Sequence, residues 1–444
     1  MEVKVTNKNY CGTIVEIKNI ITLDNCNNVC ATIIMGNHII VSKEIQIGDI
    51  GIFFPVECQL SDEYCRENNL YKDSTKNNDI NEKGYFEENR RIRCIKFRGH
   101  KSEGLFMPLT SLKFTTSNIN EFEIGQEFND INKINICQKY IIKSKTQITS
   151  SNNKNNRKKP KESILIDNQF KFHQDTSQLY RNLFKICPLS IIHISYKVHG
   201  TSAISSNILV KKKLKWHEKV IKKLGIEIID SEYKNIYSSR SVIKNNNSDL
   251  EFYGEDVWAI ANNYLKSYLQ KGMTLYYEIV GYLPSGAMIQ KDYDYGCANP
   301  TLTGDEPYTY GVHYKIFIYR ITYTNIDGKT FEFQANQVQE WCNINGLVPV
   351  IELYSGKVLD FMNQAENKLL LEGQKSFGEH FLDIIKKKYN EKDCFICSNI
   401  VPEEGCVIRI EGLNFEAFKC KSSRFYLKET ASLDKGVIDL ESEN

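Results

Sequence analysis

One twelve-residue stretch organises the chain: Ile191-Ile192-His193-Ile194-Ser195-Tyr196-Lys197-Val198-His199-Gly200-Thr201-Ser202. Its apolar run predicts a strand that delivers Lys197 into a turn closed by Gly200. An apolar strand holds the lysine amine away from bulk water, which disfavours the ammonium and frees a lone pair. Gly200 lets the backbone pass close to a ligand, and the two hydroxyl residues that follow offer donors to hold it. We therefore interpret Lys197 as a nucleophile.

The lysine-x-x-glycine spacing alone is weak evidence, because it recurs at Lys101–Gly104, Lys222–Gly225 and Lys375–Gly378. Lys197 differs from these three in its apolar lead-in and in the Thr-Ser pair after the glycine. A set of downstream stretches in a particular order also singles it out.

Length and composition favour a protein of two or three domains. The chain has 444 residues and a formal net charge of +2, so no global basic field indicates nucleic acid and any such surface must be local. The N-terminus begins with charges and strand-like alternation, and no long apolar span follows, so we expect a soluble intracellular protein without a membrane segment. The 14 cysteines are scattered, which favours reduced thiols over a disulfide framework. Cys394 and Cys397 form one CxxC without a second pair, so two incidental thiols are favoured over zinc.

The N-terminal third reads as short β-strands separated by turn residues. The expected strands are 13–17, 31–35, 38–41 and 50–55, with turns at Gly36-Asn37 and Gly48-Asp49. This pattern predicts a small barrel over residues 1–143, of OB or SH3-like type.

The densest basic segment of this region runs from Arg90 to Lys101. In an extended strand Arg91 and Arg93 would share a face, as would Lys96 and Arg98. Such a stripe beside aromatic side chains suits a nucleic-acid backbone. A solvated edge strand kept charged against aggregation explains it almost equally well.

Residues 144–163 have almost no apolar content and predict a flexible linker. A second domain is expected over 164–430, and an acidic, poorly ordered tail over 431–444. Within the second domain, Trp216, Val220 and Leu224 recur every fourth position in a lysine-rich run and predict an amphipathic helix. We expect that helix to pack on its own domain, with contact to a nucleic-acid duplex as the next alternative.

Later stretches contain further candidate residues, each of which has a structural explanation when taken alone. Glu278 is a lone acid in an apolar strand, which is costly unless it meets a partner. Phe317 and Tyr319 share one face of another strand, and Phe317 is our choice for stacking on a base. Lys419 and Lys421 would also share a face.

The order of these stretches resembles the covalent nucleotidyltransferase superfamily of polynucleotide ligases and capping enzymes. The chain looks most like ATP-dependent RNA ligases of the Deinococcus type, which carry an N-terminal OB domain. The segment from Gly84 through Arg98 to Leu109 contributes to this likeness. The resemblance implies an α+β fold, in which an OB-like β-barrel precedes an ATP-grasp-like nucleotidyltransferase domain of antiparallel sheets with peripheral helices.

The resemblance also implies a role for each matching residue. Lys197 would attack the ATP α-phosphate to give lysyl-AMP, and AMP would pass to an RNA 5′-phosphate before a 3′-hydroxyl seals the strand. The implied nucleotide ligands are Gly200, Arg240 on phosphate, Glu278 near the ribose, Phe317 on adenine, and Lys419 with Lys421 on the α-phosphate and pyrophosphate. Glu404, directly before Gly405, would hold Mg²⁺ or Mn²⁺, and Arg91, Arg93, Lys96 and Arg98 would contact nucleic acid.

The implied partner is RNA, as a nicked duplex or an RNA/DNA hybrid, bound by a monomer in RNA repair. Two departures from the family's pattern stand out: Tyr277 replaces a frequent glycine, and Ser202 replaces an asparagine that some branches use in sealing. A DNA ligase or a GTP-using capping enzyme stays open, as does a catalytically inactive nucleic-acid-binding protein. Against capping, too little chain remains after Lys421 for the OB domain that capping enzymes place there.

Overall fold

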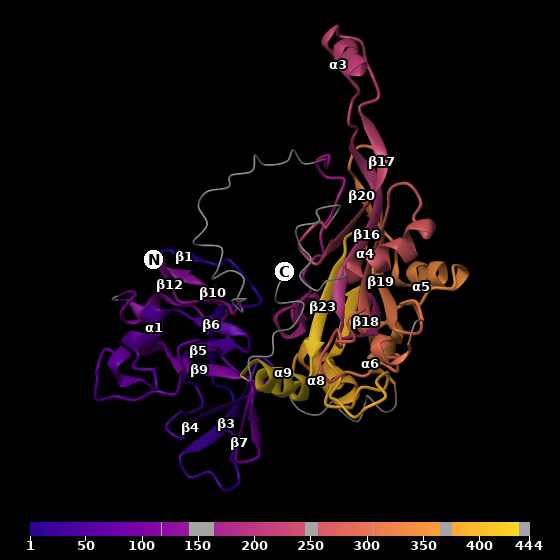
Figure 1. The fold of residues 1–444 in the computed structure, drawn as a ribbon. Helices are drawn as coiled ribbons and strands as arrows, with labels where there is room; N and C mark the ends of the chain where they lie inside the picture. The colour runs from indigo at the N-terminus through magenta and orange to yellow at the C-terminus, as the bar shows by residue number, and fades with distance from the viewer. Residues whose placement is uncertain (117, 142–163, 245–255, 305, 365–374, 435–444) are drawn as a thin grey trace.

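The computed structural model describes residues 1–116, 118–141, 164–244, 256–304, 306–364 and 375–434, with mixed α+β architecture (Figure 1). Two five-stranded sheets dominate the half of the chain after residue 164. We call β14-β23-β22-β15-β21 the lysine sheet and β17-β16-β18-β19-β20 the arm sheet. The proposed linker at 144–163 lies outside the described residues.

The lysine sheet is mostly antiparallel, and only β14 pairs with β23 in parallel. Its strands are β14 (Ser177–Gln178), β15 (Ile191–Tyr196), β21 (Glu352–Lys357), β22 (Gly405–Ile410) and β23 (Glu416–Lys421). Helices α6 (Val358–Met362) and α8 (Phe377–Tyr389) pack on it through Phe361, Phe381 and Ile384, which are completely buried. The opposite face is thereby left for the site.

The arm sheet is antiparallel throughout. It contains β16 (Thr201–Lys211), β17 (Ser231–Ser239), β18 (Met273–Gly281), β19 (Tyr314–Thr324) and β20 (Thr330–Glu332). Helices α4 (Val257–Leu265) and α5 (Ala335–Ile344) bury Trp258, Val338 and other apolar residues against it. Residues 197–200 connect the two sheets, so the predicted turn joins the two halves of the core.

The N-terminal region forms separate small sheets. Its strands are β1 (Val3–Lys4), β2 (Gly12–Glu16), β3 (Val29–Ile34), β4 (Asn37–Ser42), β5 (Ile50–Pro55), β6 (Cys58–Leu60), β7 (Ile95–Phe97), β8 (His100–Ser102), β9 (Gly104–Pro108), β10 (Glu127–Phe128), β11 (Asp130–Ile131), β12 (Ile134–Asn135) and β13 (Cys137–Lys139), with helix α1 at Asp62–Glu67. The four strands expected between residues 13 and 55 are confirmed as β2, β3, β4 and β5. The strand pairings among the described residues do not close into a ring, so the expected OB-like barrel is not confirmed.

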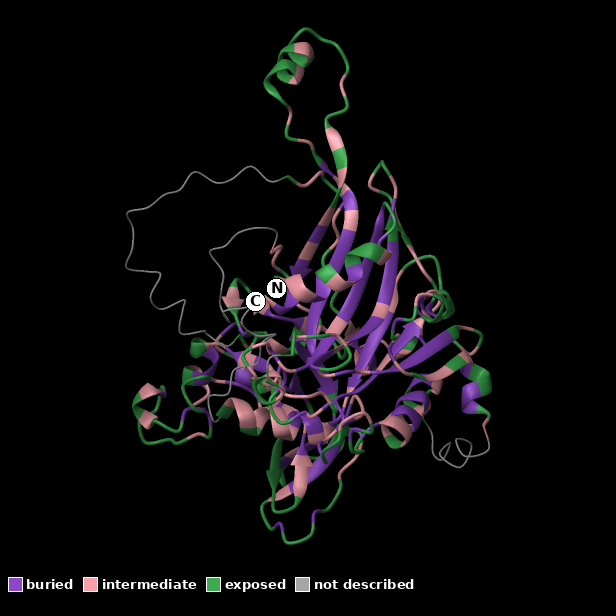
Figure 2. Cartoon of the chain, turned by 45° about the vertical axis from the view of Figure 1, so that its right-hand side comes forward, coloured by how far each residue is buried: buried purple, intermediate pink, exposed green. Residues whose placement is uncertain are grey.

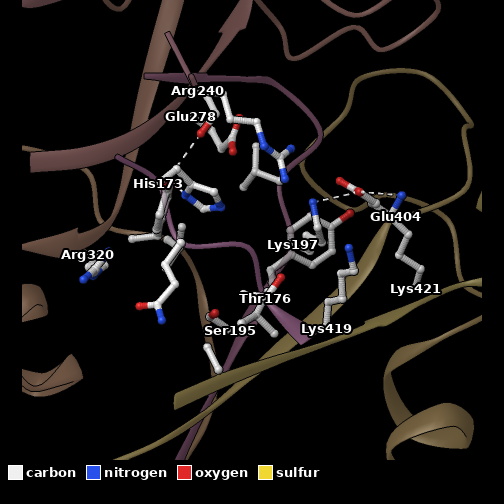
Figure 3. A pocket seen from close by; sticks show the side chains of 18 of the residues that line it. His173, Thr176, Ser195, Lys197, Arg240, Glu278, Arg320, Glu404, Lys419 and Lys421 are labelled. Carbon is white, nitrogen blue, oxygen red and sulfur yellow. Dashed lines mark hydrogen bonds and ion pairs between the residues drawn. The ribbon is translucent and has the colours of Figure 1, made fainter. Parts of the chain in front are cut away.

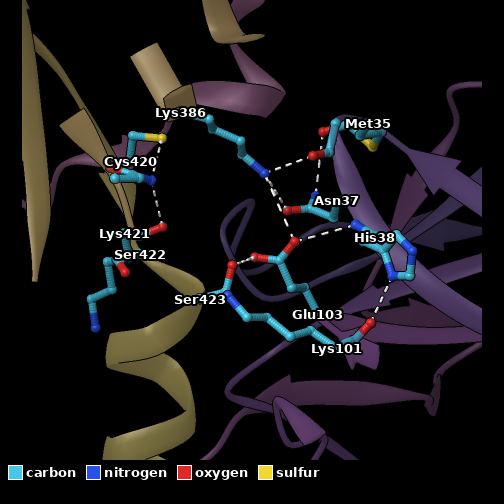
Figure 4. Close-up of polar contacts among 12 residues, drawn as sticks. Met35, Asn37, His38, Lys101, Glu103, Lys386, Cys420, Lys421, Ser422 and Ser423 are labelled. Carbon is cyan, nitrogen blue, oxygen red and sulfur yellow. Dashed lines mark hydrogen bonds and ion pairs between the residues drawn. The ribbon is translucent and has the colours of Figure 1, made fainter. Parts of the chain in front are cut away.

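The N-terminal region is tied to the second half by buried polar contacts. Arg181 donates to Glu127 Oε1 at 2.7 Å and to the Thr13 hydroxyl at 2.8 Å. Lys386 on α8 donates to the Gly36 carbonyl at 2.6 Å, and Ser423 donates to Glu103 Oε1 at 2.7 Å (Figure 4). These contacts hold β4 and β9 against α8 and the start of α9 (Ser423–Asp434).

Two expectations about the second half need correction. Residues 431–434, which we expected in a poorly ordered tail, form the end of helix α9. The helix is anchored by the buried side chains of Phe425 and Tyr426 near its start. The amphipathic lysine-rich helix is α3 (Trp216–Lys223), but none of its residues is buried. It stands at the far end of β16 and β17, away from both cores (Figures 1 and 2). No helix in the described ranges is both long and apolar enough to cross a bilayer.

Candidate active site

A cavity of about 390 Å³ lies where the two sheets meet the N-terminal region. The lysine sheet and its flanking turns contribute Lys197, Glu404, Lys419 and Lys421, while the arm sheet contributes Glu278, Tyr319 and Arg240. Figure 3 shows the charged side chains from both sheets directed toward the same space. Residues from the start, the middle and the end of the chain therefore meet at one cavity.

Lys197 lies one residue after β15, and its position is fixed by the neighbouring strand. Its backbone N–H donates to the Gly405 carbonyl at 2.9 Å. Its Nζ lies 2.7 Å from Glu404 Oε1, and 22% of the side chain is exposed. The lysine is thus directed into the cavity as half of an ion pair, within reach of a ligand.

Glu404 is the carboxylate at the centre of the charged cluster, with only 5% of its side chain exposed. Lys421 Nζ lies 3.7 Å from Oε1, and His199 Nδ1 lies 3.7 Å from Oε2. Burial opposes ionisation, but the ammonium groups of Lys197 and Lys421 hold the pKa of Glu404 below its ordinary value. Glu404 Oε2 is buried and accepts no hydrogen bond. It is the oxygen available to an incoming cation.

The glycine after Glu404 has a steric role. Gly405 has φ +129°, and a Cβ there would lie 2.1 Å from the Cys420 carbonyl oxygen of β23. This close approach brings β22 against β23 and aligns Glu404 with Lys421. Gly200 is constrained in a similar way, since its Cβ would lie 2.6 Å from the Ile279 carbonyl oxygen. Gly200 does not line the cavity, so its contact is with β18 rather than with a ligand.

Lys419 and Lys421 share a strand face, as predicted, but their surroundings differ. Lys421 lies 3.1 Å from Glu57, 3.7 Å from Glu404 and 3.8 Å from Glu429. Burial opposes its charge, yet these carboxylates raise the pKa of Lys421 well above its ordinary value. Lys419 makes no ion pair within the described part of the chain, and burial together with Lys421 lowers its pKa to about 8. Lys419 is the cation that an anionic ligand would find without a carboxylate partner.

Glu57 brings the N-terminal region into the site, and our sequence analysis missed it. It follows β5 in a turn with φ +67°, accepts a hydrogen bond from the Tyr10 hydroxyl at 3.1 Å, and faces Lys421. Burial opposes its ionisation, but Lys421 and Lys419 hold the pKa of Glu57 below its ordinary value. The available signal in the sequence was a single carboxylate between two apolar residues, Val56 and Cys58. Both neighbours are buried in the structure.

On the arm-sheet side, Arg240 and Tyr319 have partners in other segments. Arg240 forms an ion pair with Asp175. The Tyr319 hydroxyl lies 3.1 Å from Ser202 Oγ and 2.9 Å from His173 Nδ1. Burial and the nearby Arg240 lower the pKa of His173 to about 3, so the ring that shares this hydrogen bond with Tyr319 is neutral at neutral pH. His173 was the second residue that the sequence analysis missed.

The aromatic residue that lines the cavity is not Phe317, the residue we expected to stack on the base. Phe317 pairs with Glu278 across β18 and β19, but it packs with Tyr196, Val198 and Val280 and does not line the cavity. Tyr319, two residues further on the same strand, does line it. Tyr277, which replaces a frequent glycine, is buried and shares a hydrogen bond with Ser205. It does not line the cavity.

The basic segment of the N-terminal region does not form one strand. Positive φ values at Arg90 (51°) and Arg98 (47°) interrupt it, so Lys96 and Arg98 do not share a strand face. Arg91 is buried and forms an ion pair with Asp434 at 2.7 Å, and Arg93 contacts the same carboxylate at 3.0 Å. These two arginines hold α9 against the N-terminal region. Of the four basic residues expected to contact nucleic acid, only Lys96 and Arg98 are exposed.

Comparison with known proteins identifies the fold. No protein-family model matches the chain, and no curated protein matches it in sequence. An RNA ligase of Naegleria gruberi solved with pyrophosphate superposes with a TM-score of 0.55 at 15% identity, over 95% of this chain and 98% of that one.

Two further Naegleria gruberi RNA ligase structures are similar. A lysine-to-methionine mutant with AMP and Mn has a TM-score of 0.54 at 14% identity, over 94% of this chain and 98% of that one. A glutamate-to-alanine mutant with ATP and Mn has a TM-score of 0.55 at 15% identity, with the same coverage. The chain therefore has the fold of these RNA ligases over nearly its whole length, while a Deinococcus type is not confirmed.

Proposed function

We propose that this protein is an ATP-dependent RNA ligase of the Deinococcus type, which joins RNA 3′-hydroxyl and 5′-phosphate ends. The observation that supports this most is the cavity in which Lys197, Glu404, Lys419 and Lys421 converge. The fold shared with RNA ligases adds to it, because the resemblance to polynucleotide ligases had implied a nucleotidyl-transfer role for the same residues.

In the first step, the Lys197 amine attacks the α-phosphorus of ATP. A nitrogen–phosphorus bond forms, the bond from the α-phosphorus to the bridging oxygen breaks, and pyrophosphate leaves. The Lys197 ammonium, which pairs with Glu404 at 2.7 Å, must first lose a proton to solvent, because only the neutral amine has the lone pair that attacks. Lys419 is placed to neutralise the charge that develops on the phosphate oxygens.

The residues present fit a divalent cation, with Glu404 as its protein ligand. Mg²⁺ and Mn²⁺ prefer oxygen ligands, and Mg²⁺ is usually held by one or two carboxylates together with substrate phosphates. Glu404 Oε2 is buried and accepts no hydrogen bond, which leaves it available for that role. When bound, the cation withdraws charge from the phosphates as a Lewis acid.

The arm sheet would orient the nucleoside. Glu278 enters the cavity from β18 and is suited to the ribose hydroxyls, while Arg240 is suited to phosphate. We assign base stacking to Tyr319 rather than Phe317, because only Tyr319 lines the cavity.

AMP would next pass from Lys197 to an RNA 5′-phosphate, and a 3′-hydroxyl would displace it to seal the strand. We propose residues 1–143 as an OB-like module that contacts RNA through Lys96 and Arg98, and residues 164–430 as the adenylyltransferase domain. A nicked duplex or an RNA/DNA hybrid, in RNA repair, is the substrate class we expect, handled by a monomer.

The test is covalent labelling of purified protein with α-phosphate-labelled ATP and manganese. Lys197→Ala should abolish the labelled band. Lys375→Ala is the matched control because Lys375 also precedes an x-x-Gly but is exposed and pairs with Asp383, so it should label as the wild type does. Labelling by GTP instead would favour a capping enzyme. An unlabelled wild type is next treated with pyrophosphate, which should release AMP from any protein that was adenylylated during expression. If the wild type neither becomes labelled nor releases AMP, the ligase proposal is wrong.

A further inference from the structure

The β16–β17 hairpin continues well past the sheet to which it belongs. β16 pairs with β18 only from Thr201 to Ser206, yet it stays paired with β17 as far as Lys211 opposite Ser231. The outer part is braced by Ile208, Val210 and Ile236, which are buried against Leu165 and Phe170. We call residues 211–231, including α3, the arm; they stand clear of both cores in Figures 1 and 2.

The arm carries an excess of positive charge. Residues 211–230 contain seven lysines and three carboxylates. Two of the carboxylates fix the shape of the tip, since Glu218 pairs with Lys212 at 2.8 Å and Asp230 pairs with Lys222 at 2.6 Å. Glu218 also accepts the Lys215 backbone N–H at 2.7 Å. Lys211, Lys213, Lys215, Lys219 and Lys223 make no ion pair among the residues the structure describes.

Most apolar residues of the arm are exposed, and none is buried. Trp216 is 79% exposed and Leu224 is 72% exposed. An aromatic side chain among unpaired lysines is the composition of a nucleic-acid contact, where ammonium groups meet phosphates and the ring meets sugar or base. It is not the composition of a helix that packs on its own domain.

The arm is also connected directly to the candidate active site. β16 begins at Thr201, four residues after Lys197, and its ten residue steps to Lys211 span about 33 Å at roughly 3.3 Å per residue. One turn of B-form DNA is about 34–36 Å. The A-form helix of RNA is shorter per turn, so the length of β16 corresponds to slightly more than one turn of an RNA duplex. If the broken end of a duplex lies at the cavity, the phosphates that reach the tip of the arm therefore lie about one helical turn from the break.

We propose that the arm binds the phosphate backbone of double-stranded RNA about one helical turn from the join. This inference rests on the proposed ligase function for the identity of the substrate. The arm would give the protein a second contact with its RNA substrate, and this contact to the phosphate backbone would not depend on base sequence. The protein would therefore bind a broken end in a long duplex more tightly than one in a short duplex.

The test compares full-length variants on three RNAs: a nick flanked by duplex shorter than one turn, a nick flanked by about two turns, and a nick with a single-stranded extension. One variant changes Lys213, Lys215, Lys219 and Lys223 to alanine. A second replaces residues 212–230 with an Asn-Gly turn between Lys211 and Ser231, which already face each other across the hairpin. The control changes four exposed lysines elsewhere, Lys266, Lys329, Lys375 and Lys387, to alanine.

We expect both arm variants to lose about tenfold or more in affinity for the long duplex and to match the wild type on the short one. The magnitude of the slope of log Kd against log salt should fall by about 3–4 in the four-lysine variant, since each of the four phosphate contacts contributes roughly 0.7–0.9. The control should keep the affinity of the wild type. Equal losses on all three RNAs, no loss on any, or a loss confined to the single-stranded extension would overturn the proposal.

Lysine adenylylation without RNA separates this proposal from the previous one. Both arm variants should label with ATP as the wild type does, because the arm lies outside the cavity. If the wild type fails to label, the ligase function is wrong, while the binding measurements still decide whether the arm holds duplex RNA. Binding to anionic lipid vesicles with no preference for long duplex would assign the arm to a membrane instead and overturn the RNA assignment.

Discussion

The two sheets that enclose the cavity support their polar side chains in different ways. On the lysine sheet, Lys197 and Lys421 share one carboxylate, Glu404, and Lys421 also faces Glu57. On the arm sheet, Arg240 forms an ion pair with Asp175, and the Tyr319 hydroxyl contacts His173 and Ser202, so these two groups contact different residues. A change on the lysine sheet should therefore disturb several groups together, whereas a change on the arm sheet should stay local.

The largest effect should come from removing the cation that several carboxylates share. Lys421→Met would leave Glu57, Glu404 and Glu429 facing one another, and removing one partner of a buried ion pair typically costs about 3–5 kcal/mol. We expect the free energy of unfolding, measured in urea at pH 7.5, to fall by that amount. Lys419→Met should change it by less than about 1 kcal/mol, because Lys419 has no ion-pair partner among the described residues. Equal losses in the two variants would contradict the difference between these lysines.

The second prediction concerns the shared carboxylate itself. Glu404→Gln keeps the shape of the side chain but removes the charge that orients Lys197 and would hold the cation. We expect the rate of lysine adenylylation to fall about 100-fold or more, equivalent to about 2.7 kcal/mol in the barrier. The adjacent Glu403 gives a matched control, since burial raises its pKa to about 7 and glutamine resembles its protonated form. If Glu403→Gln is as damaging as Glu404→Gln, the cluster is not centred on Glu404.

The third prediction uses pH to perturb the same cluster. Burial lowers the pKa of His199 to about 4, below its ordinary 6.5, despite the opposing charge of Glu404. As pH falls through this range the unfolded chain takes up the proton first, so stability from the neutral ring is present above about pH 6.5 and lost toward pH 4. Between pH 7.5 and 5, the wild type should lose about 2 kcal/mol more than His199→Asn.

The control for this measurement is His217→Asn, at an exposed position on α3. Its loss of stability between the same two pH values should match that of the wild type. Identical pH dependence of the wild type and His199→Asn would show that His199 is not held neutral in the fold.

The smallest effect should appear on the arm sheet. Tyr319→Leu removes the aromatic wall, and such a contact is worth about 1 kcal/mol, so KM for ATP in adenylylation should rise about fivefold with kcat little changed. Tyr319→Phe keeps the ring and should retain most of the affinity. Phe317→Leu should lower stability instead, because Phe317 belongs to the core. A rise in KM with Phe317→Leu alone would restore our original choice of stacking residue.

Sequence alone predicted the groups whose spacing along the chain has a chemical meaning. Lys197 was indicated by its apolar lead-in. Glu404 was indicated only by the resemblance to polynucleotide ligases, whose glutamate-glycine motif it matches, and the structure brings both to one cavity. Along β19, however, Phe317 and Tyr319 share a strand face. Alternation cannot tell which of the two lies at the cavity and which lies deeper in the core.

Other features depended on partners that the local sequence does not encode. Glu57 meets Lys421 only through the docking of two distant regions. The apolar stripe of α3 predicted a helix correctly but could not reveal that nothing covers it. Arg90 and Arg98 break the basic segment through positive φ values, a conformation that arginine rarely adopts and that its presence does not signal.

The contact between Glu57 and Lys421 has a consequence for biosynthesis. The two residues are 364 positions apart. At a translation rate of about 5–20 residues per second, Lys421 is made roughly 20 to 70 s after Glu57. Once Lys197 has been made, the nascent chain lacks Glu404 for most of the remaining time and Lys421 throughout. Under the proposed function, we therefore expect Lys197 to react with ATP only after Lys421 and α9 have been made and have docked.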